Sequence, residues 1–381
     1  MTDKAIGVGI IGANPDKGWG SAVHIPVIER LPGFVLAAVA TTRNETARRS
    51  AAMFGAAHAF DDPRALVDCT DVDLVVITVK APEHHRLAML ALKAARHVYC
   101  EWPLAANTAQ AEEMAALARR KGVQAMVGLQ ARGAPALLKA KALIADGYIG
   151  RVVSVRMRCA LPGGGRRRSV EGLYVIDKAN GASTLAIQGG HAIDALRFVA
   201  GEFASVSAVV ATRFDEVEVI ETGACLPKDA PDQILVSGRL EQGAVVSVAV
   251  NGGVVAGHGI ALDLFGDEGS LSILGHGTSN FQMSELELLG ARLPDRVPHP
   301  LAVAEDMIIP RIFPGRQPYP GVDLPRATFV NVADLYGRLG QAIRGDARPS
   351  PDFDTGLELH RLLDAILTAS ETGVAQAIAA I

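Results

Sequence analysis

The fold is decided by the stretch Ile6-Gly7-Val8-Gly9-Ile10-Ile11-Gly12-Ala13-Asn14-Pro15-Asp16-Lys17-Gly18-Trp19-Gly20. A short apolar run ends in a turn that is rich in glycine, and such glycines let the backbone approach a pyrophosphate at the N-terminus of the next helix. The spacing is longer than in the usual Gly-x-Gly-x-x-Gly pattern, so a plain glycine-rich turn is the alternative interpretation. If the turn binds a dinucleotide, we expect the contacts to come from Gly12, Asn14, Gly18 and Trp19.

The rest of the first third repeats this strand-then-helix order. Its apolar runs are short, rich in Val, Ile and Ala, and without polar alternation, which is typical of strands buried on both faces. They are expected at residues 6–11, 35–40, 74–78, 97–100 and 125–127. Amphipathic stretches between them predict helices at residues 21–31, 45–54, 83–95 and 108–121. This alternation predicts a parallel, doubly wound Rossmann sheet.

The pattern changes after about residue 128. A helix is expected at residues 134–145, and paired strands at 234–240 with 244–250, 260–265 with 270–274, and 281–283 with 286–289. Two late helices are expected at residues 327–343 and 356–370, after a proline-rich loop at 294–325. We therefore predict a Rossmann domain over residues 1–128. An α+β domain with an open, mainly antiparallel sheet should follow over residues 129–381, with its last helix packing back on the first domain.

The bulk composition excludes several classes of protein. The chain has 381 residues, 49% of them hydrophobic and 20% charged, with a net charge of -4. These values predict a globular protein of two domains and argue against nucleic-acid binding, which needs a basic surface. The cysteines form no Cys-x-x-Cys pair, so no metal site is expected. No secretory signal and no apolar run of ~18 residues is visible, so we expect no membrane association and a cytoplasmic location.

The end of the second strand predicts the cofactor. Its last residues are Thr41, Thr42 and Arg43, where a site for NAD would place an Asp or Glu against the ribose hydroxyl. Hydroxyl and guanidinium donors instead suit a 2′-phosphate, so NADP is expected, with NAD possible. A polar helix start with a solvated arginine is the alternative.

A third motif identifies a family resemblance. The segment after the fourth expected strand reads Glu101-Trp102-Pro103-Leu104-Ala105, and it resembles the Glu-Lys-Pro segment of the glucose–fructose oxidoreductase/inositol dehydrogenase/rhizopine-catabolism (Gfo/Idh/MocA) family. The segments at residues 77–85, 127–132 and 149–152 and the start of the last helix also match, in the family's order. The resemblance implies an NAD(P)-dependent oxidoreductase of sugars or polyols. It places Pro82, His85, Glu101 and Gln130 beside the cofactor, although His85 could equally cap and pack its helix.

The family's second signature, Asp-x-Gly-x-His-x-x-Asp, is only partly matched. His191 and Asp194 are present, but Ile187 replaces the first acid and Trp102 replaces the lysine. The resemblance implies that His191 moves the substrate's hydroxyl proton and that Asp194 binds substrate. The alternative for His191 is a histidine buried at a domain junction.

Four other features are candidates for the substrate site. Trp102 could stack on the substrate or act as an apolar plug, Tyr174 could line the pocket, and Lys178 could replace the missing lysine. The arginines at 166–168 could bind an anionic substrate, although we favour the alternative of a mobile solvated loop.

The substitutions at Trp102 and Ile187 define a subgroup that resembles the yeast galactose-pathway repressor, a non-catalytic relative. We thus expect an oxidoreductase acting on a small polyhydroxylated molecule, with a non-catalytic dinucleotide-sensing regulator that binds a protein partner as the alternative. An exposed apolar sheet face in the second domain predicts a homodimer or homotetramer.

Overall fold

The computed structural model describes residues 4–257, 259–303, 317–319, 322–346 and 348–379. The chain divides into two compact units, one formed by residues 1–130 and 309–358 and the other by residues 131–308 and 359–381. Each is described by itself. Within the described residues, no helix combines the length and the apolar composition that a membrane span requires.

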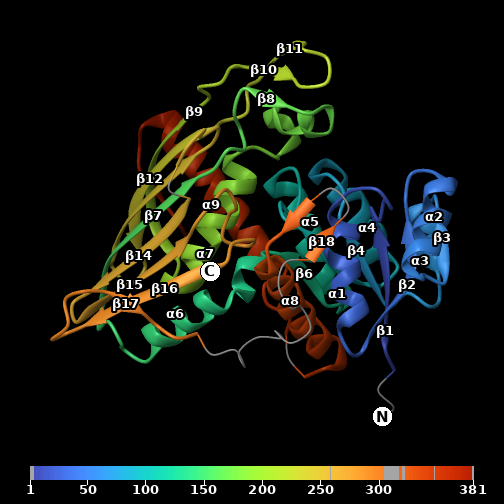
Figure 1. The fold of residues 1–381 in the computed structure, drawn as a ribbon, viewed down its shortest axis with the longest axis horizontal. Helices are drawn as coiled ribbons and strands as arrows, with labels where there is room; N and C mark the ends of the chain where they lie inside the picture. The colour runs from blue at the N-terminus through green and yellow to red at the C-terminus, as the bar shows by residue number, and fades with distance from the viewer. Residues whose placement is uncertain (1–3, 258, 304–316, 320–321, 347, 380–381) are drawn as a thin grey trace. The chain divides into compact units, whose positions relative to one another are not determined.

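The first unit contains a six-stranded parallel sheet in the order β3-β2-β1-β4-β5-β6 (Figure 1). Its strands are β1 (Ile6–Ile11), β2 (Phe34–Ala40), β3 (His58–Phe60), β4 (Leu74–Ile77), β5 (His97–Glu101) and β6 (Ala125–Gly128). The strand order reverses between β1 and β4, and this switch point is where such sheets bind ligands at the carboxyl ends of their strands. The Rossmann fold expected from the sequence is thus confirmed, with β3 as a strand that the apolar runs did not predict.

The helices of this unit begin where the sequence places helix-starting residues. Asp62 caps α3 by accepting from the Arg64 amide, and Asn107 caps α5 by accepting from the Gln110 amide. The helices are α1 (Ile25–Arg30), after a π-helical turn at Gly20–His24, α2 (Asn44–Phe54), α3 (Pro63–Asp68), α4 (His84–Lys93), α5 (Thr108–Lys121) and α8 (Arg326–Arg344).

Helix α8 belongs with the first unit although it comes late in the chain. Its Tyr336 stacks on Tyr99 of β5 at 5.3 Å and meets the rings of His24 and Phe34 edge to face. Aromatic contacts of this kind stabilise beyond the area they bury. This cluster explains why the first unit is completed by a segment that we had placed in the second domain.

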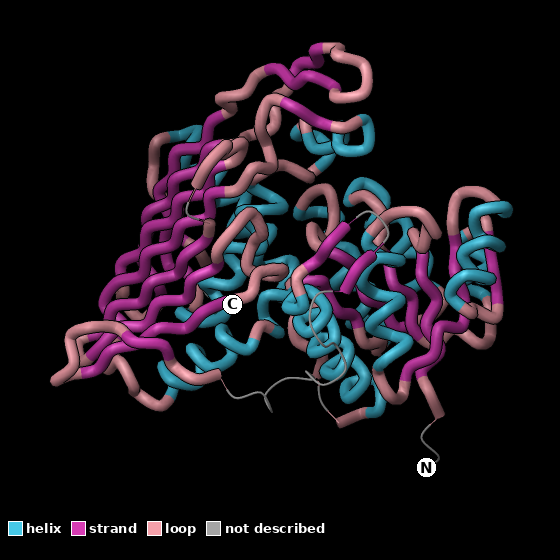
Figure 2. Tube along the Cα trace, in the orientation of Figure 1, coloured by secondary structure: helices cyan, strands magenta, loops and turns pink. Residues whose placement is uncertain are grey.

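The second unit is built on a nine-stranded sheet in the order β17-β16-β15-β14-β7-β13-β12-β9-β20. Figure 2 shows its long central strands side by side. All neighbours are antiparallel except β7 and β13, so the mainly antiparallel sheet is confirmed. The long strands are β7 (Val152–Ala160), β9 (Phe203–Ala211), β12 (Gln233–Leu240), β13 (Val245–Asn251), β14 (Ile260–Gly266), β15 (Gly269–Gly275) and β16 (Leu286–Arg292). The short ones are β17 (His299–Pro300) and β20 (Gln376–Ala377).

One strand expected from the sequence in this unit is not formed. Residues 281–283 form a turn instead of a strand, since Asn280 accepts from the Phe281 and Met283 amides there. The helices are α6 (Pro135–Ala145), α7 (Gly190–Ala200) and the later part of α9 (Phe353–Thr372). A small sheet of β8 (Arg167–Arg168), β10 (Glu216–Val219) and β11 (Cys225–Pro227) lies beyond the end of the large one (Figure 1).

The expected proline-rich loop at 294–325 falls partly outside the described residues. Its described part includes the hairpin of β18 (Gln317–Tyr319) and β19 (Val322–Leu324).

The two faces of the large sheet differ. On β12, Ile234 and Val236 are buried whereas Leu235 between them is 54% exposed. Helices α6 and α7 pack against strands of this sheet, and Val209 and Leu235 line a shallow depression of about 650 Å³ on it. The unit therefore has one sheet face that α6 and α7 leave uncovered, on which the exposed Val209 and Leu235 lie among polar and charged side chains.

Candidate active site

The turn after β1 is shaped by glycines that tolerate no side chain. Gly12 has a φ of +105°, and a Cβ there would lie 2.8 Å from Thr78 Oγ1. A Cβ at Gly20 would lie 2.5 Å from the same oxygen. Gly18 also has a positive φ, +102°, which disfavours residues with a Cβ. The backbone of this turn therefore lies closer to β4 than any other residue type would allow.

Hydrogen bonds hold this turn in place. Asn14 Oδ1 accepts from the Asp16 amide at 2.9 Å, and Ser21 Oγ donates to the Asn14 carbonyl at 2.5 Å. Ser50 of α2 donates to the Ala13 carbonyl at 2.6 Å. The side chain of Asn14 is thus used within its own loop. The Trp19 indole nitrogen is buried and has no acceptor in the described part of the chain.

A pocket of about 390 Å³ opens beside this turn at the carboxyl ends of β1, β2 and β4. It brings together Gly12 and Asn14 with Thr41 and Thr42, as the sequence predicts for a dinucleotide site. Sequence reasoning missed other residues of its wall, which come from the start of α3 and from the segment after β4. These are Asp61, Pro63, Lys80, Glu83 and Arg86.

The three residues after β2 have different roles. Thr41 Oγ1 lies 2.9 Å from the Arg43 carbonyl and 2.6 Å from Thr46 Oγ1, so its hydroxyl hydrogen is used inside the chain. Thr42 lines the pocket and is exposed. Arg43 is exposed at the start of α2, and no ion pair is formed by its guanidinium within the described residues. Thr42 and Arg43 therefore remain the candidate donors to a 2′-phosphate.

The two histidines after β4 are held by the protein itself. His84 is buried, with Nδ1 2.7 Å from the Pro103 carbonyl and Nε2 2.9 Å from the Val79 carbonyl. Burial lowers its pKa, while the two carbonyl acceptors act in the opposite direction, and the ring lies between the pocket segment and the loop after β5. His85 bonds to Glu113 of α5 at 2.9 Å and, like Pro82, is not part of the pocket wall.

Glu101, at the end of β5, is the centre of a polar network. His24 Nε2 lies 2.9 Å from one carboxylate oxygen, and Gln130 Nε2 donates to the other at 2.7 Å. Because a carboxylate only accepts, the bond to Glu101 requires a hydrogen on His24 Nε2, and Nδ1 lies 2.8 Å from the Tyr336 hydroxyl. A Cβ at Gly128 would lie 2.8 Å from this carboxylate. The structure thus joins the predicted residues Glu101 and Gln130 and adds His24 and Tyr336.

Trp102 follows this glutamate and is 5% exposed. An indole ring therefore occupies the position of the family's lysine, and the residue supplies no acid or base there. Between the two interpretations offered by the sequence, this burial favours the apolar plug.

The geometry of the first unit fits a dinucleotide. Gly12 and Gly20 leave no room for a Cβ, the pocket beside them is lined by Thr42, and the N-terminus of a helical segment follows at Gly20. Those are the features that accommodate a pyrophosphate and an adenosine ribose.

In the second unit, His191 lies in the first turn of α7 and is 5% exposed. A π-helical turn at Leu185–Gly189 precedes the helix, and such turns often occur at functional sites. Ile187, in that turn, is half-buried and brings no carboxylate to His191.

Asp194 has a structural role in place of the predicted substrate contact. Arg132 Nε donates to one of its oxygens at 2.9 Å and Arg132 Nη2 to the other at 2.7 Å. Asp194 is 0% exposed, so no face of its carboxylate is accessible to a small molecule. Its position in the motif suggested contact with substrate, but a bidentate buried ion pair uses both oxygens.

Lys178 is also placed differently from our expectation. Its side chain is 71% exposed, and Nζ lies 3.8 Å from Asp229 Oδ2. The Lys178 amide donates to the same carboxylate at 2.8 Å, so this surface loop is held by Asp229. We therefore withdraw Lys178 as a catalytic group. Tyr174 is half-buried, and burial raises its pKa.

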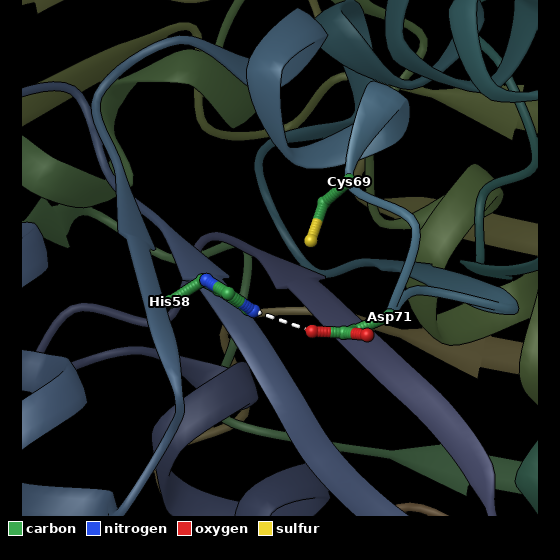
Figure 3. A group of neighbouring side chains, drawn as sticks. All are labelled: His58, Cys69 and Asp71. Carbon is green, nitrogen blue, oxygen red and sulfur yellow. Dashed lines mark hydrogen bonds and ion pairs between the residues drawn. The ribbon is translucent and has the colours of Figure 1, made fainter.

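One group of side chains in the described part of the chain has the donors of a metal site, although none was predicted. Ligand atoms of His58, Cys69 and Asp71 lie within 4.8 Å of one another (Figure 3). His58 Nε2 and Asp71 Oδ2 are 2.7 Å apart, so a hydrogen bond accounts for their approach. His58 begins β3 and Asp71 precedes β4, so the group lies toward the amino ends of the strands, away from the pocket.

Comparison with known proteins places the chain in a family. Residues 6–129 match the model of the oxidoreductase family with an NAD-binding Rossmann fold, and residues 135–275 match that of the Gal80p C-terminal domain. The chain is 31% identical over 292 residues to the galactose/lactose metabolism regulatory protein GAL80 of Saccharomyces cerevisiae, covering 71% of this chain and 67% of that protein. The chain belongs to the Gfo/Idh/MocA family.

Its members similar to this chain include enzymes as well as regulators. The levoglucosan dehydrogenase of Pseudarthrobacter phenanthrenivorans is 28% identical over 70% of this chain and 73% of its own length. The solved structure of an NAD binding oxidoreductase from Klebsiella pneumoniae has a TM-score of 0.84 at 28% identity, covering 99% of this chain and all of the other. The resemblance deduced from the motifs is therefore confirmed, and the family contains both sugar dehydrogenases and Gal80 regulators.

Proposed function

We propose that this protein is an NADP-dependent oxidoreductase that acts on a carbinol or carbonyl carbon of a sugar, polyol or related polyhydroxylated compound. The observation that carries the proposal is the turn at residues 12–20. It is pressed against Thr78 and opens on a pocket that Thr42 lines, and Thr42 and Arg43 follow β2 where a site for NAD would carry an acid. A loop shaped in this way fits the pyrophosphate of a dinucleotide.

The chain's own residues divide the work. Backbone amides around Gly12 and Gly20 would hold the pyrophosphate, while Thr42 and Arg43 would bind the ribose phosphate. Glu101, held by His24 and Gln130, fixes the loop that carries Trp102. His191 would accept the proton of the substrate hydroxyl in oxidation and return it in reduction. The bound dinucleotide would supply the hydride chemistry.

A second candidate is a non-catalytic regulator that senses the dinucleotide and binds a protein partner. Three observations favour it. Both oxygens of Glu101 accept hydrogen bonds, Trp102 is buried where the family has a lysine, and Ile187 replaces an acid. The two substitutions remove proton-transfer groups, and neither residue belongs to the turn at residues 12–20.

One experiment separates the two candidates. The purified protein with NADP⁺ or NADPH is assayed against a panel of sugars, polyols and their oxo forms, and cofactor binding is titrated in parallel by fluorescence. Turnover with any panel member supports the enzyme. Firm cofactor binding without turnover supports the regulator, and no cofactor binding contradicts both.

We further propose that the uncovered sheet face joins two copies of the chain, as a dimer or within a tetramer. Val209 and Leu235 are 63% and 54% exposed there, and Arg156 is neutralised by Asp263 at 2.9 Å. Exposed apolar side chains gathered on an uncovered sheet face are typical of an interface. Light scattering should give at least a dimer mass, and Leu235→Arg should shift the mass to that of a monomer. A monomer mass for the wild type at micromolar concentration would contradict this assembly.

A further inference from the structure

Three consecutive arginines of the second unit have three different environments. Arg167 pairs with Glu218 of β10 at 3.3 Å, and Arg166 is exposed with its guanidinium 5.9 Å from the Phe214 ring. Arg168 is half-buried, and none of the described carboxylates forms an ion pair with it. Successive residues of a strand point to opposite faces, so β8 turns Arg167 to solvent and Arg168 inward.

The segment around Arg168 is packed instead of solvated. The Gly253 amide donates to the Gly163 carbonyl at 2.7 Å, and a Cβ at Gly165 would lie 2.9 Å from Gly253 Cα. Residues 163–165 are therefore fixed against the turn after β13. The mobile loop favoured from the sequence does not agree with this packing.

Arg168 shares its surroundings with Gln188 and Tyr174. Arg168 Nη2 lies 3.9 Å from the position of a Cβ at Gly163, and Gln188 Nε2 lies still closer to that point. Tyr174 is near enough for its charge state and that of Arg168 to influence each other, and burial lowers the pKa of Arg168. An arginine half removed from water without an anion loses solvation that no ion pair in the described chain replaces.

Gln188 has an unused acceptor. Its Oε1 atom is buried and has no hydrogen-bond partner among the described residues. Gln188 precedes His191 by three residues in one continuous helical segment. Gln188 thus lies within one helical turn of the candidate acid–base residue, and Arg168, which forms no ion pair among the described residues, shares the surroundings of Gln188.

We propose that Arg168, beside Gln188, forms a subsite for an acidic group of the substrate, so that the substrate is a polyhydroxylated carboxylic acid such as an aldonate or uronate. The planar guanidinium of Arg168 matches a carboxylate with two parallel N–H···O bonds. A single guanidinium neutralises one charge, which favours a carboxylate over a phosphate dianion. This inference rests on the proposed function, because it assigns the substrate class of the His191 site.

The test uses the full chain with NADP⁺ and matched pairs of acids and neutral sugars, such as galacturonate with galactose and gluconate with sorbitol. Binding is measured by calorimetry, and kcat/KM is measured wherever turnover occurs. The wild type should prefer the acid of a pair by about 10- to 100-fold, as expected for one charged hydrogen-bonded contact. Arg168→Gln should abolish that preference and Arg168→Lys should retain part of it. Arg167→Gln, which makes the same charge change on the same strand, should leave it unchanged.

The outcomes separate this inference from the proposed function. Acids that bind through Arg168 without any hydride transfer support the subsite and contradict the enzyme. Turnover of neutral sugars with no effect of Arg168→Gln supports the enzyme and overturns the subsite. Absence of binding by every acid at millimolar concentration, or a preference for phosphorylated sugars, also overturns it. If Arg168→Gln does not fold, the ranking of acids over neutral sugars by the wild type still decides.

Discussion

The glycine turn of the first unit and helix α7 of the second carry the two halves of the expected reaction, and they use their polar groups differently. Around the turn, Ser21 and Ser50 hold the backbone, while Thr42 and Arg43 remain at the surface. Along α7 Asp194 is committed to Arg132, and Ile187 in the turn before α7 has no polar group. We therefore expect dinucleotide binding and proton transfer to be separable properties in this chain.

The most direct way to sharpen this contrast is to remove His191. If the protein is an enzyme, His191→Ala should lower kcat about 10²- to 10⁴-fold, which is the usual contribution of a general acid–base group. Dinucleotide affinity should change little, because the candidate cofactor residues belong to the other unit. Steady-state kinetics and fluorescence titration measure the two effects.

His276→Ala, at a surface histidine, is the control and should have the activity of the wild type. Turnover by His191→Ala at the wild-type rate would remove His191 from the mechanism while leaving the enzyme assignment in place.

Asp194 should behave in the opposite way. Asp194→Ala leaves the Arg132 guanidinium buried without its anion, so we expect a loss of about 3–5 kcal/mol of unfolding free energy. Urea denaturation measures this loss. The double variant Arg132→Met with Asp194→Leu should recover part of the stability, because the Arg132 charge is removed together with its anion and Arg197, 3.9 Å from Asp194, keeps Glu202. A stable Asp194→Ala protein with impaired catalysis would instead return Asp194 to the substrate site.

Buried histidines should lower the free energy of unfolding as the pH falls. Burial lowers the pKa of His360 to about 4, whereas the unfolded chain binds this proton near 6.5. Between pH 6.5 and 4 the unfolded state therefore holds more protons than the native state, and stability falls with decreasing pH by up to about 3 kcal/mol. His84, whose pKa burial also lowers, acts in the same direction.

The measurement compares urea unfolding of the wild type and His360→Gln at pH 7 and pH 4. The variant should lose about 3 kcal/mol less than the wild type over this range. Asp334, whose pKa burial raises to about 6, acts in the opposite direction in both proteins and cancels in the difference. If both proteins lost the same free energy of unfolding between pH 7 and pH 4, His360 would not be responsible for the loss of stability in acid.

The same contrast explains what the sequence could predict. Apolar runs identified most of the Rossmann strands, because short apolar runs bounded by turn residues are typical of strands covered on both faces. The three-residue edge strand β3 is too short to show it, and β7 and β9 place Arg, Ser and Ala on their partly exposed faces. The ion pair of Arg132 with Asp194 joins residues that are 62 positions apart, and Asp61 and Thr42 come from different segments of one pocket wall. Local sequence patterns predict neither contact, because both depend on which elements the topology brings together.

The smallest expected effect concerns cofactor choice. Arg43→Ala should weaken NADPH by about 1.5–3 kcal/mol, as one charged phosphate contact would, and leave NADH nearly unchanged. The pocket also contains Asp61, which is exposed and could instead accept from the ribose hydroxyls of NADH while repelling a 2′-phosphate. Asp61→Asn should therefore favour NADPH, which is the reverse of the effect of Arg43→Ala.

Fluorescence titration of both cofactors against both variants gives four affinities, with the exposed Arg48→Ala of α2 as the control for a general loss of positive charge. If Arg43→Ala weakens both cofactors equally, the arginine does not recognise the phosphate. If Asp61→Asn weakens NADH alone, the acid missing from the end of β2 is supplied by the neighbouring strand connection. The protein would then use NAD in spite of Thr42 and Arg43, because a carboxylate that reaches the ribose determines the choice wherever it originates in the sequence.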